Sequence, residues 1–147
     1  MNLKISDNIK IALIGCGSWG KNIARNLSQL NVLSCIYDPH SNIAKQITND
    51  LKLPTYSLGE IFSDKKISAV VIASSADTHI DIAKEALLNS KDVLIEKPFC
   101  LSLSDAKNIS NLALEKNMIL MVGHLLNYHN AFIKMKNLIN KGKIGSI

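Results

Sequence analysis

Residues 9–20 read Ile-Lys-Ile-Ala-Leu-Ile-Gly-Cys-Gly-Ser-Trp-Gly, an apolar run that passes through three glycines into a helical pattern. This order predicts a strand, a tight loop and the start of a helix. Gly15 lets the chain turn where the strand ends, Gly17 leaves room for a pyrophosphate, and Gly20 lets the helix pack close to the strand. The first N–H groups of that helix would then face an anion.

Glycine-rich turns of this kind are common, so the surrounding sequence decides what this one means. The next apolar run, residues 32–37, ends in Asp38. A carboxylate about 20 residues beyond the glycine turn contacts the adenosine ribose of a bound dinucleotide in proteins of this type. The alternative interpretation of Asp38 is an ordinary turn residue that precedes Pro39.

The composition indicates a single globular domain spanning residues 1–147, because 47% of the residues are hydrophobic and 20% are charged. The net charge of +5 does not indicate nucleic-acid binding: the basic residues are scattered lysines, Arg25 is the one arginine, and aromatic residues are few. Three widely spaced cysteines without a Cys-x-x-Cys pair predict neither a disulfide framework nor a metal site.

The chain has no apolar run near the ~18 residues of a membrane span, and residues 1–8 lack the apolar core of a signal peptide. We therefore expect a cytoplasmic protein with no membrane partner. The cysteines fit a reducing compartment, where they act as small buried hydrophobic residues.

Apolar periodicity continues along the rest of the chain as an alternation of strands and helices. It predicts strands at residues 9–14, 32–37, 55–56, 67–73, 92–95 and 118–122, and helices at 18–30, 43–51, 58–62, 80–87, 104–116 and 130–141. The expected fold is α/β: a Rossmann-type, doubly wound, mostly parallel sheet of about six strands with helices on both faces.

Polar clusters follow the predicted strands at the points where they end. They are the glycine turn, Asp38, Ser74-Ser75, Glu96-Lys97 and residues 124–127. Because ligands of doubly wound sheets bind at the carboxyl ends of the strands, this arrangement predicts a dinucleotide site.

At Glu96-Lys97-Pro98, directly after the strand at 92–95, the chain resembles the Gfo/Idh/MocA family of NAD(P)-dependent oxidoreductases. Thr78-His79 and the segment Val-Gly-His-Leu-Leu-Asn-Tyr-His at 122–129 are also similar to that family, whereas Asn130 departs from the proline of many members. The form Gly-Ser-Trp-Gly-Lys-Asn at 17–22 looks most like members acting on nucleotide-linked sugars, such as UDP-N-acetylglucosamine and glucosaminuronate 3-dehydrogenases.

The resemblance implies a role for each residue of the predicted site. Backbone groups of the glycine loop would contact the pyrophosphate, and Asp38 would contact the ribose. Ser74 and His79 would lie along the cofactor, with Glu96 and Lys97 near its nicotinamide end. Lys97 would also lie beside the substrate and take part in catalysis. The cofactor-binding set is Gly15, Gly17, Ser18, Trp19, Gly20, Asp38, Ser74, His79, Glu96 and Lys97.

Purely structural roles remain as alternatives for several of these residues. Lys97 can be a surface lysine before proline, although burial would let it lose a proton near neutrality, as a proton shuttle requires. His79 can be a turn histidine, Trp19 a packing residue, and His124 and His129 structural residues.

The expected cofactor is NAD, with NADP disfavoured, because the Asp38 carboxylate accepts from both ribose hydroxyls and repels a 2′-phosphate. The resemblance implies a sugar or nucleotide-linked sugar as substrate. In the family, a substrate-binding half would begin near Ile147, so the chain is expected to be the cofactor half alone, inactive by itself and prone to self-association.

Two other classes of function stay open at this point. One is a nucleotide-binding module without chemistry, or a subunit that pairs with another chain. The other is a methyltransferase, which also combines a glycine-rich turn with an acidic residue after the second strand, but whose chemistry does not call for Lys97.

Overall fold

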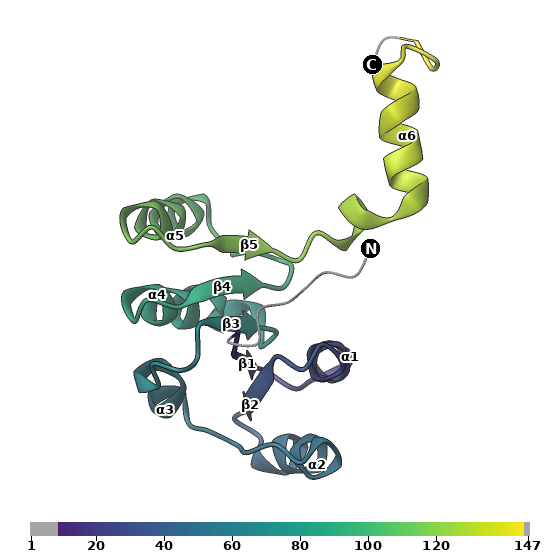
Figure 1. Cartoon of the computed structure of the whole chain (residues 1–147). Helices are drawn as coiled ribbons and strands as arrows, with labels where there is room; N and C mark the ends of the chain where they lie inside the picture. The colour runs from purple at the N-terminus through teal and green to yellow at the C-terminus, as the bar shows by residue number, and fades with distance from the viewer. Residues whose placement is uncertain (1–8, 146–147) are drawn as a thin grey trace.

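The computed structural model describes residues 9–145 and contains one five-stranded sheet in which every neighbouring pair of strands is parallel (Figure 1). The strand order is β2-β1-β3-β4-β5. The strands are β1 (Ile11–Ile14), β2 (Leu33–Tyr37), β3 (Ala69–Ile72), β4 (Asp92–Ile95) and β5 (Leu120–Val122). Residue 147, where the sequence predicts the passage to a second domain, and the N-terminal residues 1–8 lie outside the described part.

Helices connect the strands and follow the last of them. The α-helices are α1 (Ser18–Gln29), α2 (Ser41–Leu51), α3 (Leu58–Ser63), α4 (His79–Leu88), α5 (Leu103–Glu115) and α6 (Asn130–Asn140). Two short 3₁₀ helices, η1 (Ala76–Thr78) and η2 (Leu125–Tyr128), follow β3 and β5. Among residues 9–145, none of the helices combines the length and apolar character that crossing a bilayer requires.

The sheet is covered on both faces because its central strands are apolar at successive positions, so both faces must be buried. On one face, Ala24 of α1 and Ala44 of α2 pack on Leu13 of β1. On the other face, α3, α4 and α5 contribute buried side chains that pack against Ile14 and Ile72. The doubly wound α/β fold predicted from the sequence is therefore confirmed.

Two local predictions need correction. The expected sixth strand at residues 55–56 is a single parallel bridge between Thr55 and Ile36, because Pro54 has no N–H to extend a ladder. The helix expected to start at Ser104 starts one residue earlier, and Ser102 caps it by accepting a hydrogen bond from the Asp105 N–H at 3.1 Å.

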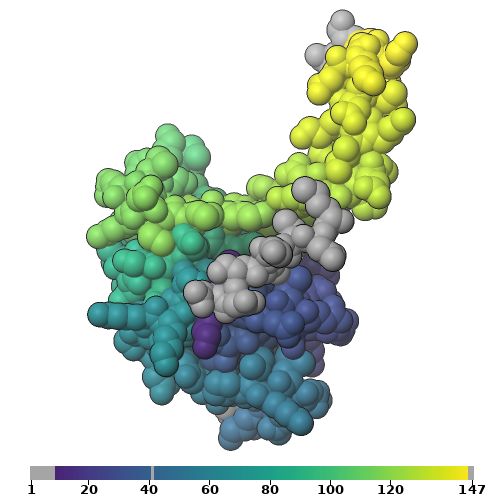
Figure 2. Space-filling model, viewed as in Figure 1, coloured from purple at the N-terminus to yellow at the C-terminus, as the bar shows by residue number. Residues whose placement is uncertain are grey.

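Helix α6 extends away from the sheet and its covering helices (Figures 1 and 2). None of its side chains is buried, and it contacts η2 at its base. We call residues 125–140 the η2–α6 arm. Five large apolar side chains on it are exposed: Leu125, Leu126, Tyr128, Ile133 and Met135.

Candidate functional site

The glycine turn between β1 and α1 has the backbone geometry that the sequence predicts. Gly15 has φ +98°, and a Cβ there would collide with the backbone of Ala73 and Ser74. A Cβ at Gly20 would collide with the carbonyl oxygen of Gly15, whereas the space beside Gly17 is open. The turn thus needs glycine for conformation at one position and for close packing at another, and it leaves room for a ligand at the third.

The N-terminus of α1 is free to bind an anion. Gly17 occupies the N-cap position and offers no side-chain cap, and the first turn of the helix contains no acidic residue. Ser18 and Trp19 begin the helix with exposed side chains. The unsatisfied N–H groups and the positive end of the helix dipole therefore suit a pyrophosphate.

Asp38 is held in place by the backbone on both sides of it. Its Oδ2 accepts a hydrogen bond from the Cys16 N–H at 2.7 Å, and its Oδ1 accepts one from the His40 N–H at 2.8 Å. Each carboxylate oxygen keeps a further lone pair for another donor. The structure thus links the acidic residue after β2 directly to the glycine turn after β1.

The thiol of Cys16 beside this carboxylate is not a reactive group. Burial, with a further contribution from the Asp38 charge, raises the pKa of Cys16 to about 12. Burial likewise raises the pKa of Cys35 to about 12. Both cysteines are fully buried and serve as packing residues, as expected for thiols that stay protonated.

A cavity of about 600 Å³, which we call the Asp38 cavity, opens beside this carboxylate. Four of the predicted cofactor-binding residues line it, namely Gly15, Gly17, Asp38 and Ser74. The Ser74 hydroxyl lies 2.7 Å from that of Thr78, and both face the same space. The remaining wall contains apolar side chains that suit a flat ring: Ile43, Leu58 and Ile82.

Lys97 lines a different cavity, of about 320 Å³, together with Gly123 and residues 124–127. We call it the Lys97 cavity. The lysine side chain is exposed rather than buried. His124 lines the same cavity, whereas His129 accepts the Ala131 N–H at 3.2 Å at the start of α6.

Glu96 and Trp19 contact each other rather than standing separately. The indole N–H of Trp19 donates to Glu96 Oε1 at 2.8 Å, and the Lys97 N–H donates to Glu96 Oε2 at 3.3 Å. The carboxylate lies against Gly123, where a Cβ would come within 2.9 Å of Oε1. Sequence reasoning missed Gly123, although a glycine directly after the strand β5 was a usable signal.

His79 is buried beside the Ser74 carbonyl and joins two loops. Its side chain is 1% exposed, with Nδ1 2.9 Å from the Pro98 carbonyl oxygen and Nε2 3.1 Å from that of Ser74. Its ring therefore connects the loop after β3 to the loop after β4. Contact between this histidine and a cofactor stays a prediction.

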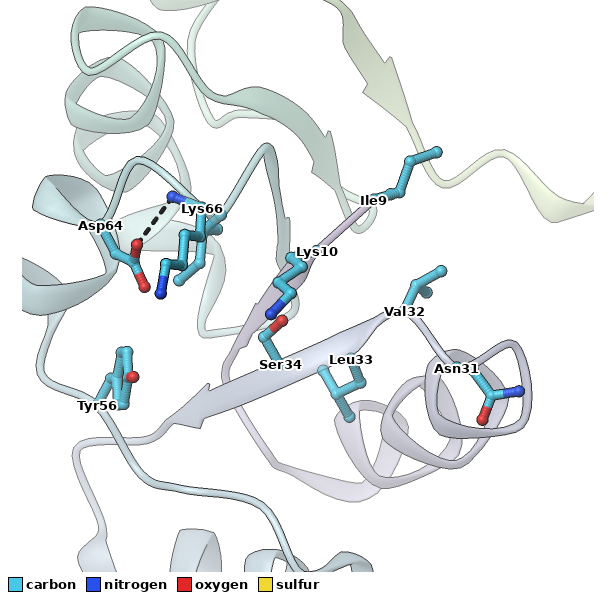
Figure 3. A pocket seen from close by; sticks show the side chains of 10 residues that line it. Ile9, Lys10, Asn31, Val32, Leu33, Ser34, Tyr56, Asp64 and Lys66 are labelled. Carbon is cyan, nitrogen blue, oxygen red and sulfur yellow. Dashed lines mark hydrogen bonds between the residues drawn. The ribbon is translucent and has the colours of Figure 1, made fainter. Parts of the chain in front are cut away.

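A third cavity, of about 420 Å³, lies at the opposite edge, near the amino ends of β1, β2 and β3 (Figure 3). Its lining includes Lys10, Ser34, Tyr56 and Lys66, and the Lys66 N–H donates to Asp64 Oδ1 at 2.8 Å. None of the predicted site residues lines it. The Asp38 cavity is larger than this one, at about 600 Å³ against about 420 Å³, and it lies at the carboxyl edge, where the predicted site residues are.

These features define a dinucleotide-binding α/β protein: a parallel sheet, a glycine turn before an uncapped helix, and an anchored carboxylate after the second strand. The model of the Gfo/Idh/MocA oxidoreductase family, described as an NAD-binding Rossmann fold, matches residues 9–124. The chain belongs to this family. Membership rules out the methyltransferase interpretation.

Named relatives include enzymes of inositols and of nucleotide-linked sugars. The scyllo-inositol 2-dehydrogenase (NAD(+)) of Bacillus subtilis is 32% identical over 142 residues, which cover 93% of this chain and 42% of that protein. The UDP-N-acetylglucosamine 3-dehydrogenase of Acidithiobacillus ferrooxidans is 26% identical over 125 residues, covering 84% of this chain and 39% of that protein.

A solved structure confirms the fold. Scyllo-inositol dehydrogenase from Lactobacillus casei, with bound NAD(H) and scyllo-inositol, superposes with a TM-score of 0.87 at 23% identity, covering 95% of this chain and 43% of that one. The chain spans about two fifths of the length of the curated relatives it matches.

Proposed function

We propose that this chain binds NAD(H) along the carboxyl edge of its sheet, as the cofactor-binding half of an oxidoreductase acting on a sugar, a polyol or a nucleotide-linked sugar. The observation that carries the proposal is the fixed position of Asp38, whose two oxygens are held by the Cys16 and His40 N–H groups beside the free N-terminus of α1. When bound, the nicotinamide supplies hydride transfer. The chain's own groups bind and orient it.

Different groups of the chain suit different parts of the cofactor. The N-terminus of α1 and the open space at Gly17 suit the pyrophosphate, and Asp38 suits the adenosine ribose. Ile43 and Leu58 offer an apolar surface for the adenine ring. The nicotinamide end then points toward Glu96 and the exposed Lys97, where the substrate would lie.

NAD is the proposed cofactor in preference to NADP. The charge of Asp38 favours ribose hydroxyl donors and opposes a 2′-phosphate. Arg25, the one arginine of the chain, lines a different hollow, with residues of α1 and α2, and not the Asp38 cavity. No guanidinium therefore offsets the repulsion.

Calorimetric titration with NAD⁺ and NADP⁺ tests the proposal. Wild-type protein should bind NAD⁺ more tightly, and Asp38→Asn should narrow the difference, because asparagine keeps an acceptor oxygen and removes the charge. Asp50→Asn makes the same charge change at an exposed position of α2 and should preserve the preference. Tighter binding of NADP⁺ by the wild type would contradict the assignment of NAD.

A nucleotide-binding module that pairs with another chain is the second candidate. The exposed apolar side chains of the η2–α6 arm favour it, because contiguous apolar surface on a protein marks a contact region. A turnover assay that follows NADH absorbance, with polyols and nucleotide sugars as substrates, separates the two candidates. A catalytic chain produces NADH, whereas a binding module does not.

A further inference from the structure

The Asp38 cavity and the Lys97 cavity share no lining residue, although a dinucleotide bound as proposed extends from the first toward the second. One contact between the segments beside them is the hydrogen bond from the Trp19 indole to Glu96. Trp19 lies two residues beyond Gly17, which lines the first cavity, and Glu96 precedes Lys97, which lines the second. Neither Trp19 nor Glu96 is itself a lining residue, but their hydrogen bond joins the segments next to the two linings.

Sheet topology places both partners of this contact at the edge along which the proposed ligand would lie. Trp19 belongs to the helix that follows β1, whereas Glu96 follows β4, and β3 lies between these two strands in the sheet. A ligand that runs along the carboxyl edge from Asp38 to Lys97 passes the ends of the same three strands. Its path therefore runs near the contact between Trp19 and Glu96.

The two partners of this hydrogen bond differ in their freedom to move. Glu96 is 8% exposed and lies against the backbone of Gly123, so its carboxylate has no space to shift toward β5. The Trp19 side chain is 48% exposed, which is unusual for a tryptophan that serves as a packing residue. Rotation of the indole into solvent is consequently the easier way to break the contact.

We propose that Trp19 is a gate that distinguishes dinucleotides from mononucleotides. A ligand long enough to enter both cavities displaces the indole from Glu96, whereas an adenosine mononucleotide fills the Asp38 cavity while the gate stays closed. This inference rests on the proposed NAD site. It makes Trp19 a residue that sets specificity for ligand length, beyond any contact it makes with the pyrophosphate.

Trp19 is the single tryptophan of the chain, so intrinsic fluorescence reports on the gate alone. The experiment titrates the 147-residue protein with NAD⁺ and with AMP, following tryptophan emission and, separately, heat by calorimetry. NAD⁺ should change the emission at saturation, and AMP should bind with the emission of the free protein. Equal emission changes from two ligands that both bind by calorimetry would overturn the gate and leave the NAD site intact.

Two variants sharpen the test. Trp19→Phe removes the indole N–H, so NAD⁺ no longer has a hydrogen bond to break and should bind several-fold more tightly, up to about tenfold, with AMP affinity unchanged. Glu96→Gln keeps the fluorophore and weakens the bond by removing the charge, so emission of the free variant should shift toward that of the NAD⁺ complex. Tyr56→Phe, at the opposite edge, is the control and should change neither ligand's affinity.

The outcomes separate the two proposals. Loss of affinity for both ligands in Trp19→Phe, with an unchanged melting temperature, would mean that the indole supports binding and does not gate it. Failure of the wild type and of Trp19→Phe to bind NAD⁺ would overturn the NAD site itself, and the gate with it.

Discussion

The two ends of the carboxyl edge of the sheet differ in how far neighbouring residues enclose the predicted site residues. At the β1–β2 end, Gly15 is buried, Asp38 is fixed by two backbone N–H groups, and residues from several elements line the cavity. At the β5 end, Lys97 is exposed and the arm that follows exposes large apolar side chains. The comparison teaches that the described residues form walls around Asp38, whereas the surface beside Lys97 is open.

The largest expected effect comes from a substitution of Gly15, in the turn at the β1–β2 end. Gly15→Ala forces a side chain into the left-handed region and against the backbone of Ala73 and Ser74. Strain of this kind costs about 1–3 kcal/mol before the collision is counted, so thermal unfolding should occur at least several degrees lower and NAD⁺ binding should be lost. Calorimetry and thermal melts measure both.

Gly59→Ala is the matched control for that substitution. Gly59 lies in α3 with open space around it and an ordinary backbone conformation. Alanine there should be neutral or stabilise by up to about 1 kcal/mol, because glycine is the poorer helix former. An equal melting temperature for the two variants would show that the turn tolerates a side chain.

The second prediction is that alkaline pH lowers the stability of the protein through the buried thiols of Cys16 and Cys35. Burial raises the pKa of each thiol from an ordinary 9.0 to about 12. Between these values the unfolded chain loses the thiol protons and the folded chain keeps them, so stability falls as pH rises above about 9. Each thiol contributes a loss of up to about 1.4 kcal/mol per pH unit.

Chemical denaturation at several pH values tests the titration of these thiols. The free energy of unfolding should decline from pH 9 upward, and Cys16→Ala should reduce the slope by about half, since one of the two thiols remains. A slope that is identical in the variant would show that Cys16 does not titrate differently in the folded and unfolded states.

The sequence predicted the geometry of the glycine turn at the β1–β2 end well because its signals are local. The glycines and Asp38 have geometric roles that hold wherever a strand, a turn and a helix follow one another. The contact between Trp19 and Glu96 was beyond prediction because it joins residues 77 positions apart, and its formation depends on the crossing of α1 over the sheet. Whether Lys97 is buried could not be predicted for a related reason, since burial depends on what lies opposite, and the structure leaves this side chain exposed.

The third prediction concerns self-association through the η2–α6 arm, at the β5 end of the sheet. Leu126→Glu places a charge at a 68% exposed position of the η2–α6 arm and should reduce self-association of the purified protein, measured by sedimentation velocity. Stability should change by less than about 0.5 kcal/mol, because no packed contact is removed. Leu114→Glu, at a 79% exposed position of α5, is the control.

The arm is the contact surface only if the two leucine variants differ. A similar reduction in both would point to a general effect of added negative charge on a basic protein. Wild-type protein that sediments as a monomer at every concentration would contradict the prediction that the chain self-associates.

The smallest expected effect is that of Lys97→Ala on cofactor affinity. The side chain is exposed, and the hydrogen bond of this residue to Glu96 comes from its backbone N–H, which alanine keeps. NAD⁺ affinity measured by calorimetry should therefore stay within about twofold of the wild type, a difference of roughly 0.4 kcal/mol. Asp38→Asn, which changes an anchored carboxylate, should have a larger effect.

In catalysis, by contrast, we expect Lys97 to matter. Hydride transfer requires a substrate carbon about 3–3.5 Å from the nicotinamide, with an acid or base aligned on the substrate oxygen. The wild-type chain alone should produce no NADH from polyols or nucleotide sugars, since the open end offers little surface to position a substrate. Clear activity that Lys97→Ala abolishes without changing NAD⁺ affinity would prove that prediction wrong and assign the catalytic role to Lys97. A large loss of NAD⁺ affinity in Lys97→Ala would instead place this lysine in the cofactor site.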